Sequence, residues 1–410
     1  MSPPLKIEDP IDQPPRPSSG FALFNYGFRP FFFFAGLFGA GSILIWVGVY
    51  VGHVDLNLTS PPVLWHAHEM LFGYAAAAIA GFFLTVVPNW TEAKAQKGPV
   101  LMGLTVLWLL GRMAVWGQGS LPYTWVAVLD MTFLIGLTIV IVRPLIRSQN
   151  RRQLLFVPIL LSLIVGNAMT HLSVLGIFDL GAFDLGEQGI TLAIDAVLVL
   201  IAIMGGRVTP SFTSSFLGHA NPNVKVLQNA TLNKAVLVAS WTVLTVDQVA
   251  AGSVYSGTMF MIASILHLVR LLGWQGWRTL SSPLLWALHL GYLWFVVGMA
   301  LKGLADFGFI EPTSALHGLT IGAIGTMTLA IMSRASLGHT GRPMKAHPAV
   351  VVAYVLLSGA ALARLSVAWW PDMALELIMG SAVMWTGAFV LFFIIYAPIL
   401  CRPRIDGRPG

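Results

Sequence analysis

Charged residues are scarce in this sequence: Asp, Glu, Lys and Arg together make up only 10% of its 410 residues. A water-soluble globular domain carries about 25% charged residues. Hydrophobic residues instead account for 56% of the chain. The length alone would permit about two or three soluble domains, but this composition excludes an ordinary soluble protein and indicates an integral membrane protein.

Cysteine is nearly absent, since Cys401 is the only one in the chain. A single cysteine excludes an internal disulfide and a metal site built from several cysteines of one chain. Any metal or cofactor must then be held by His, Met, Asp, Glu or backbone groups. The sequence also has no c-type attachment motif, so a haem would be bound non-covalently, as b-type haem is.

Motifs for nucleotide binding, phosphorylation, proteolysis or hydrolysis are also lacking. The glycines of "GAIGTMTLA" fall in an apolar run, which is typical of a membrane span and not of a phosphate loop. The net charge of +6 is not evidence for nucleic-acid binding, because membrane proteins concentrate Lys and Arg in their cytoplasmic loops. We therefore expect membrane lipids, and no nucleic acid, as partners.

Long apolar runs dominate what is present. A helix needs about 20 apolar residues to cross the hydrocarbon, and the sequence contains twelve candidate spans. These spans are 31–52, 67–88, 99–117, 121–143, 153–175, 188–206, 235–252, 254–272, 283–301, 313–334, 347–369 and 373–399. They predict an all-α, polytopic membrane bundle at 29–400. We expect a disordered, proline-rich cytoplasmic tail at 1–28, which is not a cleaved signal peptide, and a cytoplasmic tail at 401–410.

The distribution of positive charge orients the predicted bundle. With the N-terminus in the cytoplasm, every Lys and Arg except Arg112, Lys302 and Arg364 falls on the cytoplasmic side. This asymmetry is what the positive-inside rule predicts for a protein of the cytoplasmic membrane. It supports twelve spans, because a missed span would reverse every later loop. We therefore expect both termini in the cytoplasm.

Four histidines fall near the outer ends of the predicted spans: His66, His68, His171 and His317. Imidazole binds copper, iron and zinc, so these residues are candidate metal ligands. The structural alternative is that they hydrogen-bond to neighbouring helices or lie at the membrane interface.

The string "WHAHEM" at 65–70 is the most unusual part of this outer group. His66 and Met70 are four residues apart and share a helix face, whereas His68 points largely the other way. One helix turn therefore cannot present both histidines to one metal. Glu69 is the candidate catalytic residue, because a carboxylate beside a ligand can accept a ring N–H or relay a proton. Met70 suits haem or copper, although packing is the more common role of methionine.

A second pair of histidines lies near the inner ends of two consecutive spans. His267 and His289 belong to antiparallel spans joined by a short loop, so we expect them to meet at similar depth. Two histidines on adjacent helices can hold a haem iron from its two faces. Arg207, in "GGRVTPSFTSSF" at the end of the 188–206 span, is a candidate partner of a haem propionate. The alternatives are packing histidines and a cytoplasmic arginine at a helix end.

Three aspartates interrupt apolar runs: Asp130, Asp195 and Asp247. Each should face a cavity, a partner or a proton path, because an isolated charge in hydrocarbon is costly. Arg112 and Lys302 are candidate partners for them. Lys302 can also pair with Asp306, which lies four residues later on the same span.

Several long stretches of this chain resemble the NnrS family. They are "GFRPFFFFAGLFG" (27–39), "WHAHEMLFGYAAAAIAGFFLTVVPNWT" (65–91), the pattern GRV.P.FT (206–213) and "LHGLTIGAIGTMTLAIMSRASLGHTGRP" (316–343). The resemblance extends from about residue 20 to 400. It implies a bacterial inner-membrane protein with twelve spans that contains haem and copper. It also implies a role in denitrification and in tolerance of nitric oxide.

The sequence supports hypotheses of different classes. The first is a haem- and copper-binding membrane protein that reduces or binds nitric oxide, with an electron donor and an oligomeric state that the sequence does not identify. The second is a transporter for a small solute or a metal ion, which a two-fold repeat would support, although no such repeat is visible. The third is a protein that binds or senses the gas without turnover.

Overall fold

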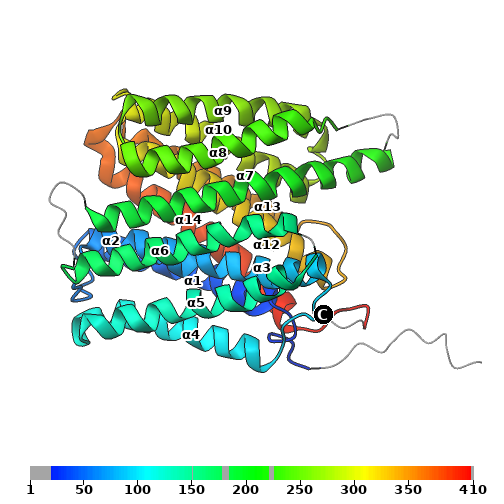
Figure 1. The fold of residues 1–410 in the computed structure, drawn as a ribbon, viewed down its shortest axis with the longest axis horizontal. Coiled ribbons are helices and arrows are strands. Elements are labelled where there is room, and N and C mark those ends of the chain that lie inside the picture. The colour runs from blue at the N-terminus through cyan, green and yellow to red at the C-terminus, as the bar shows by residue number, and fades with distance from the viewer. Residues whose placement is uncertain (1–19, 150, 178–183, 221–225, 408–410) are drawn as a thin grey trace, which may run out of the picture.

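The computed structural model describes residues 20–149, 151–177, 184–220 and 226–407 (Figure 1). Helices and their connections make up these residues, and no strand occurs among them. Eleven helices in the described residues are long and apolar enough to cross a membrane. The predicted all-α class of a polytopic membrane protein is therefore confirmed. Residues 1–19 of the predicted N-terminal tail lie outside the described residues.

Ten long helices of the described chain are uninterrupted, and nine of them are among the eleven spans. The ten helices are α1 (Phe28–Tyr50), α4 (Pro99–Trp116), α5 (Tyr123–Arg147), α6 (Phe156–Val174), α7 (Leu185–Ala220), α8 (Ala230–Ala250), α9 (Val254–Gly273), α10 (Pro283–Asp306), α13 (Pro348–Ser366) and α14 (Ala374–Cys401). Several begin with proline, whose missing N–H costs nothing in the first turn of a helix. The prediction placed a span at the position of α8, but α8 is not apolar enough to count among the eleven.

Two further spans are composite. The first joins α2 (Pro62–His68), the π-helical segment η1 (Glu69–Ala75) and α3 (Ala76–Thr91) into one continuous helix. The second joins α11 (Pro312–His317), the π-helical segment η5 (Gly318–Gly325) and α12 (Thr326–His339). Each π-helical segment thus follows a short helix that ends on a histidine.

α7 does not end where the sequence indicated. The prediction that "GGRVTPSFTSSF" terminates this span is wrong, because α7 continues through it to Ala220 with Pro210 inside the helix. Proline removes one backbone hydrogen bond. The buried Thr213 side chain supports this part of the helix by donating to the Thr209 carbonyl at 2.8 Å. Residues 207–220, which follow the predicted 188–206 span, are therefore helical.

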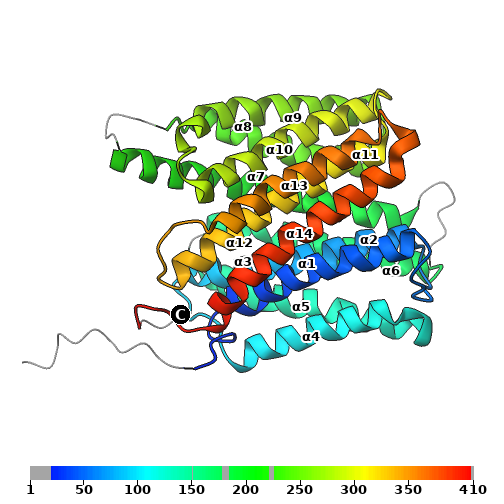
Figure 2. The same ribbon diagram turned by 180° about the vertical axis from the view of Figure 1, so that it is seen from behind.

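The two ends of the bundle's chain meet. Figure 2 shows α1 beside α14, and these helices pack along one another. The Ala22 N–H donates to the Cys401 carbonyl at 2.8 Å. The buried Arg29 guanidinium donates to the carbonyls of Leu400 at 2.8 Å and Arg402 at 2.7 Å. Both ends of the described chain therefore lie at the same end of the bundle.

The centre of the bundle is formed by the two composite spans and α7. In the most apolar part of the α2–α3 span and of α7, 83% of residues are buried, against 39% for α1. α6 approaches α7 closely where Gly166 faces Gly189, since a Cβ on either glycine would lie 2.5 Å from the carbonyl oxygen of the other. This contact fixes the position of α6, which carries His171.

Candidate functional site

A buried polar network joins α2, η1, α4, α5 and α6. Arg112 of α4 donates to both Glu69 and Asp130 and forms an ion pair with each. At most 7% of each of these three side chains is exposed. The predicted pairing of Arg112 with a buried aspartate is confirmed for Asp130. Such pairing is required because an unpaired buried charge costs several kcal/mol, about 3–5 when one partner is removed.

Two histidines complete this network. His68 Nδ1 lies 3.1 Å from Glu69 Oε1, and its Nε2 lies 2.9 Å from Asn167 Oδ1 and 3.2 Å from Asp130 Oδ2. His171 Nε2 lies 3.0 Å from the same Asp130 oxygen. His68, Asp130 and His171 each offer one ligand atom, and these atoms lie within 4.8 Å of one another. The group can hold a metal ion, or it can hold a proton shared between histidine and carboxylate.

Glu69 is held at the start of η1 by three neighbours. It accepts hydrogen bonds from Arg112 and from Trp116 Nε1, the latter at 2.5 Å, and it contacts the ring of His68. Its side chain is 1% exposed. Glu69 is therefore fixed in orientation next to a ring that can exchange a proton with it.

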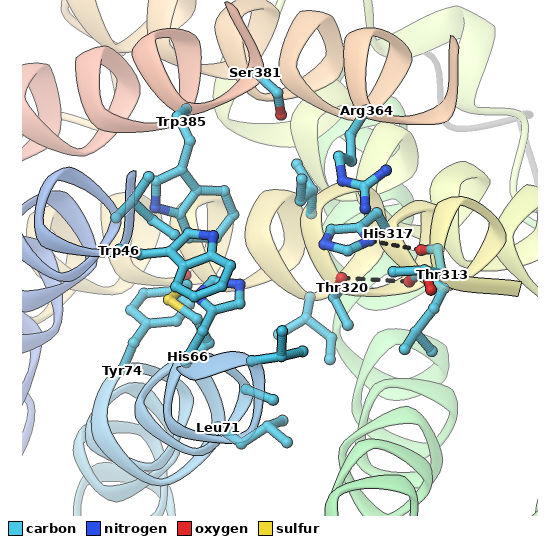
Figure 3. A pocket seen from close by; sticks show the side chains of 18 of the residues that line it. Trp46, His66, Leu71, Tyr74, Thr313, His317, Thr320, Arg364, Ser381 and Trp385 are labelled. Atoms are coloured by element: carbon cyan, nitrogen blue, oxygen red, sulfur yellow. Dashed lines mark hydrogen bonds between the residues drawn. The ribbon is translucent and has the colours of Figure 1, made fainter. Parts of the chain in front are cut away.

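The α2–α3 span has the buried network on one side and an apolar cavity of about 190 Å³ on the other. His66 and His317 belong to its wall, together with Met70 and Arg364 (Figure 3). His66 stacks on Trp46 with ring centroids 4.4 Å apart and an interplanar angle of 14°. Figure 3 shows Arg364 beside His317. The cavity thus presents imidazole and thioether groups within an otherwise mainly apolar lining.

The turn that carries His317 is fixed by local hydrogen bonds. His317 Nδ1 lies 2.6 Å from the Thr313 carbonyl, so Nδ1–H donates there and Nε2 keeps its lone pair for a ligand. At the start of α11, Glu311 accepts from the backbone N–H groups of Thr313 at 2.8 Å and Ser314 at 2.5 Å. Burial opposes the charge of Glu311, but these hydrogen bonds outweigh it and lower the pKa of Glu311 to about 2.

The four outer histidines are thus divided between two places. His66 and His317 line the cavity, whereas His68 and His171 belong to the buried network. His66 and His68 point to different sides of one helix, as residues two apart must. The outer group that the sequence indicated therefore corresponds to two sites with separate chemistry.

The inner histidines each have partners of their own. His267 lies 2.6 Å from the Tyr292 hydroxyl and 3.1 Å from Ser240 Oγ. His289 Nε2 lies 2.9 Å from Thr213 Oγ1. The buried Nδ1 of His289 has no hydrogen-bond partner among the described residues. Each of the two rings is therefore anchored to neighbouring helices.

Arg207 lies within α7 and not at a helix end. Its guanidinium donates to Gln153 Oε1 at 2.9 Å and lies over the Phe156 ring, 5.3 Å from the centroid. Thr213, the partner of His289, follows six residues later, which is about 120° around the helix. Arg207 and His289 therefore face different sides of α7.

The NnrS family, described as NnrS protein, matches residues 22–404 of the chain. This chain belongs to the NnrS family. No curated protein matches it. Family membership and the apolar helices together place it among multi-pass membrane proteins of the nitric oxide response.

The three positive residues that depart from the charge asymmetry all occupy special positions in this NnrS family member. Arg112 belongs to the buried network and Arg364 to the cavity wall. Lys302 lies 2.6 Å from Asp306 and 3.3 Å from Asp247, which confirms the predicted pair four residues apart. Arg364 was an exception to the positive-inside rule, and this exception was the sequence signal that could have identified it as a site residue.

Proposed function

We propose that this protein binds haem and copper in the bacterial inner membrane and acts there in nitric oxide metabolism or tolerance. The observation that carries the proposal is the cavity in which His66 and His317, from two different spans, face one space beside Met70. Histidine and methionine are both known axial ligands of haem iron. Arg364 offers the positive charge that a propionate needs.

The size of the cavity limits how a haem can enter. Its volume of about 190 Å³ is below the roughly 300–1,000 Å³ of typical ligand pockets. Haem binding would therefore have to displace part of the lining. The stacked rings of His66 and Trp46 are the first candidates, because His66 must turn toward the iron.

We assign copper to the network. His68, Asp130 and His171 supply two imidazoles and a carboxylate, a donor set that suits copper among other divalent metals. Copper there would replace hydrogen bonds of both rings to Asp130, whereas Arg112 would retain its pairing with Glu69. This assignment keeps the two cofactors on opposite sides of the α2–α3 span.

A bound haem would supply an iron that takes up nitric oxide, and the chain supplies the surroundings. His66 or His317 would hold the haem, Arg364 would orient its propionate, and the apolar lining would exclude water. Reduction of nitric oxide consumes protons, and Glu69 lies beside the His68 ring, with which it can exchange one. Glu69 is then the group that relays protons if the protein turns over.

The first test is the colour of the purified protein. The full chain is produced in cells supplied with haem and copper, and its reduced-minus-oxidised visible spectrum is recorded with iron and copper analysis. We expect a haem band and near-stoichiometric iron. His66→Ala and His317→Ala should lose iron and keep copper, and His68→Ala and His171→Ala should do the reverse. His53→Ala, at an exposed loop position, is the control. A colourless, metal-free protein would overturn the proposal.

The role of Glu69 is tested separately. Glu69→Gln should leave the haem spectrum and nitric oxide binding intact but slow consumption of nitric oxide by about 100-fold, the lower range for a lost proton-transfer group. Unchanged consumption in this variant would reject the proton relay. A wild-type protein that binds nitric oxide without consuming it would instead support binding or sensing without turnover.

The transporter hypothesis has less support. Transporters commonly bind substrate where two membrane helices are unwound near the midplane. In the described residues both composite spans remain helical through their π-helical segments. A metal-free protein that moves a solute across vesicles would nevertheless restore this hypothesis.

A further inference from the structure

Three cavities follow one another along the centre of the bundle. The outer cavity of about 190 Å³ contains His66 and His317. A middle cavity of about 60 Å³ is lined by Ala78, Val197 and Thr328, among others. An inner cavity of about 360 Å³ is lined by residues that include Arg334 and His339 near the end of α12.

The same three spans line all of these cavities, one helical turn after another. On the α2–α3 span, Tyr74 faces the outer cavity and Ala78 the middle one. On α7, Ile194 faces the outer cavity and Val197 the middle one. Residues three or four apart lie on one face of a helix. The outer and middle cavities are therefore consecutive spaces between the same helix faces.

A hydrogen-bonded side-chain contact lies between the outer and the middle cavity. Tyr74 lines the outer cavity and Thr328 the middle one, and their hydroxyl groups are hydrogen-bonded to each other. Thr328 also donates to the Ile324 carbonyl at 2.7 Å. This contact joins η1 of the first composite span to α12 of the second.

The middle and inner cavities share part of their lining. Phe32, Phe82 and Ile331 line both of them. These three apolar side chains lie between the two cavities. The row of cavities therefore crosses the bundle with two narrow places.

The lining determines what can pass. Among the described residues that line the middle cavity, Thr328 has the only polar side chain. A charged species there would pay the cost of burial in hydrocarbon. A water molecule needs about 10–15 Å³ of such volume, so about 60 Å³ admits only a molecule of a few heavy atoms. The passage suits a small, uncharged, weakly polar molecule such as a diatomic gas.

We propose that the row of cavities between the two composite spans and α7 is a passage for small uncharged molecules, closed at the Tyr74–Thr328 contact and at Phe32, Phe82 and Ile331. The passage connects the inner end of the bundle to the outer cavity. This proposal rests on the arrangement of the cavities and does not depend on haem or copper binding.

Cysteine accessibility tests the passage without any metal. Because Cys401 is the only native cysteine, Cys401→Ser provides a clean background. Ala78→Cys places a thiol in the middle cavity. Ala77→Cys is the matched control, since Ala77 is 0% exposed, lies on the same helix and is outside the three cavities. Both variants are treated in detergent with the small neutral reagent methyl methanethiosulfonate and with a charged trimethylammonium analogue.

We expect the neutral reagent to modify Ala78→Cys at least about tenfold faster than Ala77→Cys, a difference of about 1.4 kcal/mol in barrier. The charged analogue should modify neither. Adding Tyr74→Phe should raise the rate at Ala78→Cys, because it removes the hydroxyl that closes the outer side. Equal rates at the two cysteines would overturn the passage. An unchanged rate with Tyr74→Phe would overturn Tyr74–Thr328 as its closure. Neither result bears on haem binding, so the two proposals fail separately.

Discussion

Arg112 illustrates how much one side chain decides in this protein. It pairs with two carboxylates, Glu69 and Asp130, that belong to different helices. Asp130 in turn contacts both histidines of the network. One positive charge on Arg112 thus balances one of the two negative charges. The other can be balanced by a proton on a histidine or by a metal ion. Lys302 has a similar role between Asp247 and Asp306.

Replacement of Arg112 tests this role. Arg112→Met leaves Glu69 and Asp130 buried without their cation, and we expect a loss of about 3–5 kcal/mol in the free energy of unfolding. Denaturant unfolding in detergent, followed by circular dichroism, measures the loss. Arg143→Met is the control, because Arg143 lies exposed on α5 and should change stability by no more than about 0.5 kcal/mol.

A second variant keeps this prediction decisive if Arg112→Met does not fold. Combining it with Glu69→Gln and Asp130→Asn removes the unpaired charges and should restore most of the stability. Equal stability of Arg112→Met and Arg143→Met would contradict the account of the network.

At the scale of elements, the two π-helical segments distinguish the composite spans from the other spans of the described chain. A π-helical turn widens the helix and changes the direction of the side chains around it, and such turns are frequent at functional sites. η1 begins directly after His68, and η5 directly after His317. The first turns of both spans are therefore offset from the helices that continue into the membrane.

The contact between α6 and α7 gives a prediction at this scale. Gly166→Ala would place a methyl group against the Gly189 carbonyl and force the helices apart, so we expect a loss of about 1–3 kcal/mol from overpacking. The movement should also weaken copper binding, because α6 carries His171. Thermal unfolding and copper analysis of the purified variant measure both effects.

Gly136→Ala is the matched control for this prediction. A Cβ at Gly136 of α5 would meet its nearest neighbours at 3.5 Å, an ordinary contact. Alanine favours a helix over glycine by about 1 kcal/mol, so this variant should be as stable as the wild type or more so. A loss at Gly136→Ala equal to that at Gly166→Ala would show that the close approach of α6 and α7 is not the cause.

At the scale of the whole molecule, the meeting of Ala22 with Cys401 places both ends of the described chain on one side. The positive-inside rule predicts that this is the cytoplasmic side. Alkaline phosphatase fused after residue 407 should be inactive, because its disulfides form only outside the cytoplasm. The same enzyme inserted after Gly52, in the loop between α1 and α2, should be active. The reverse pattern would contradict the predicted orientation.

The sequence by itself determined the membrane class and the approximate positions of most spans. These properties follow from hydrophobicity, which acts locally and is proportional to the apolar surface of each segment. The pairing of Arg112 with Asp130 was also predictable, because few partners exist for a charge in an apolar run.

Tertiary structure alone decided which histidines share a site. Whether His66 meets His317 or His171 depends on how each helix is rotated about its axis, and packing against neighbouring helices sets that rotation. The π-helical segments and the continuation of α7 through Pro210 depend on the same packing, and no periodicity in the sequence indicates them. The row of cavities is a property of three spans that come from distant parts of the chain, so it exists only once they are packed together.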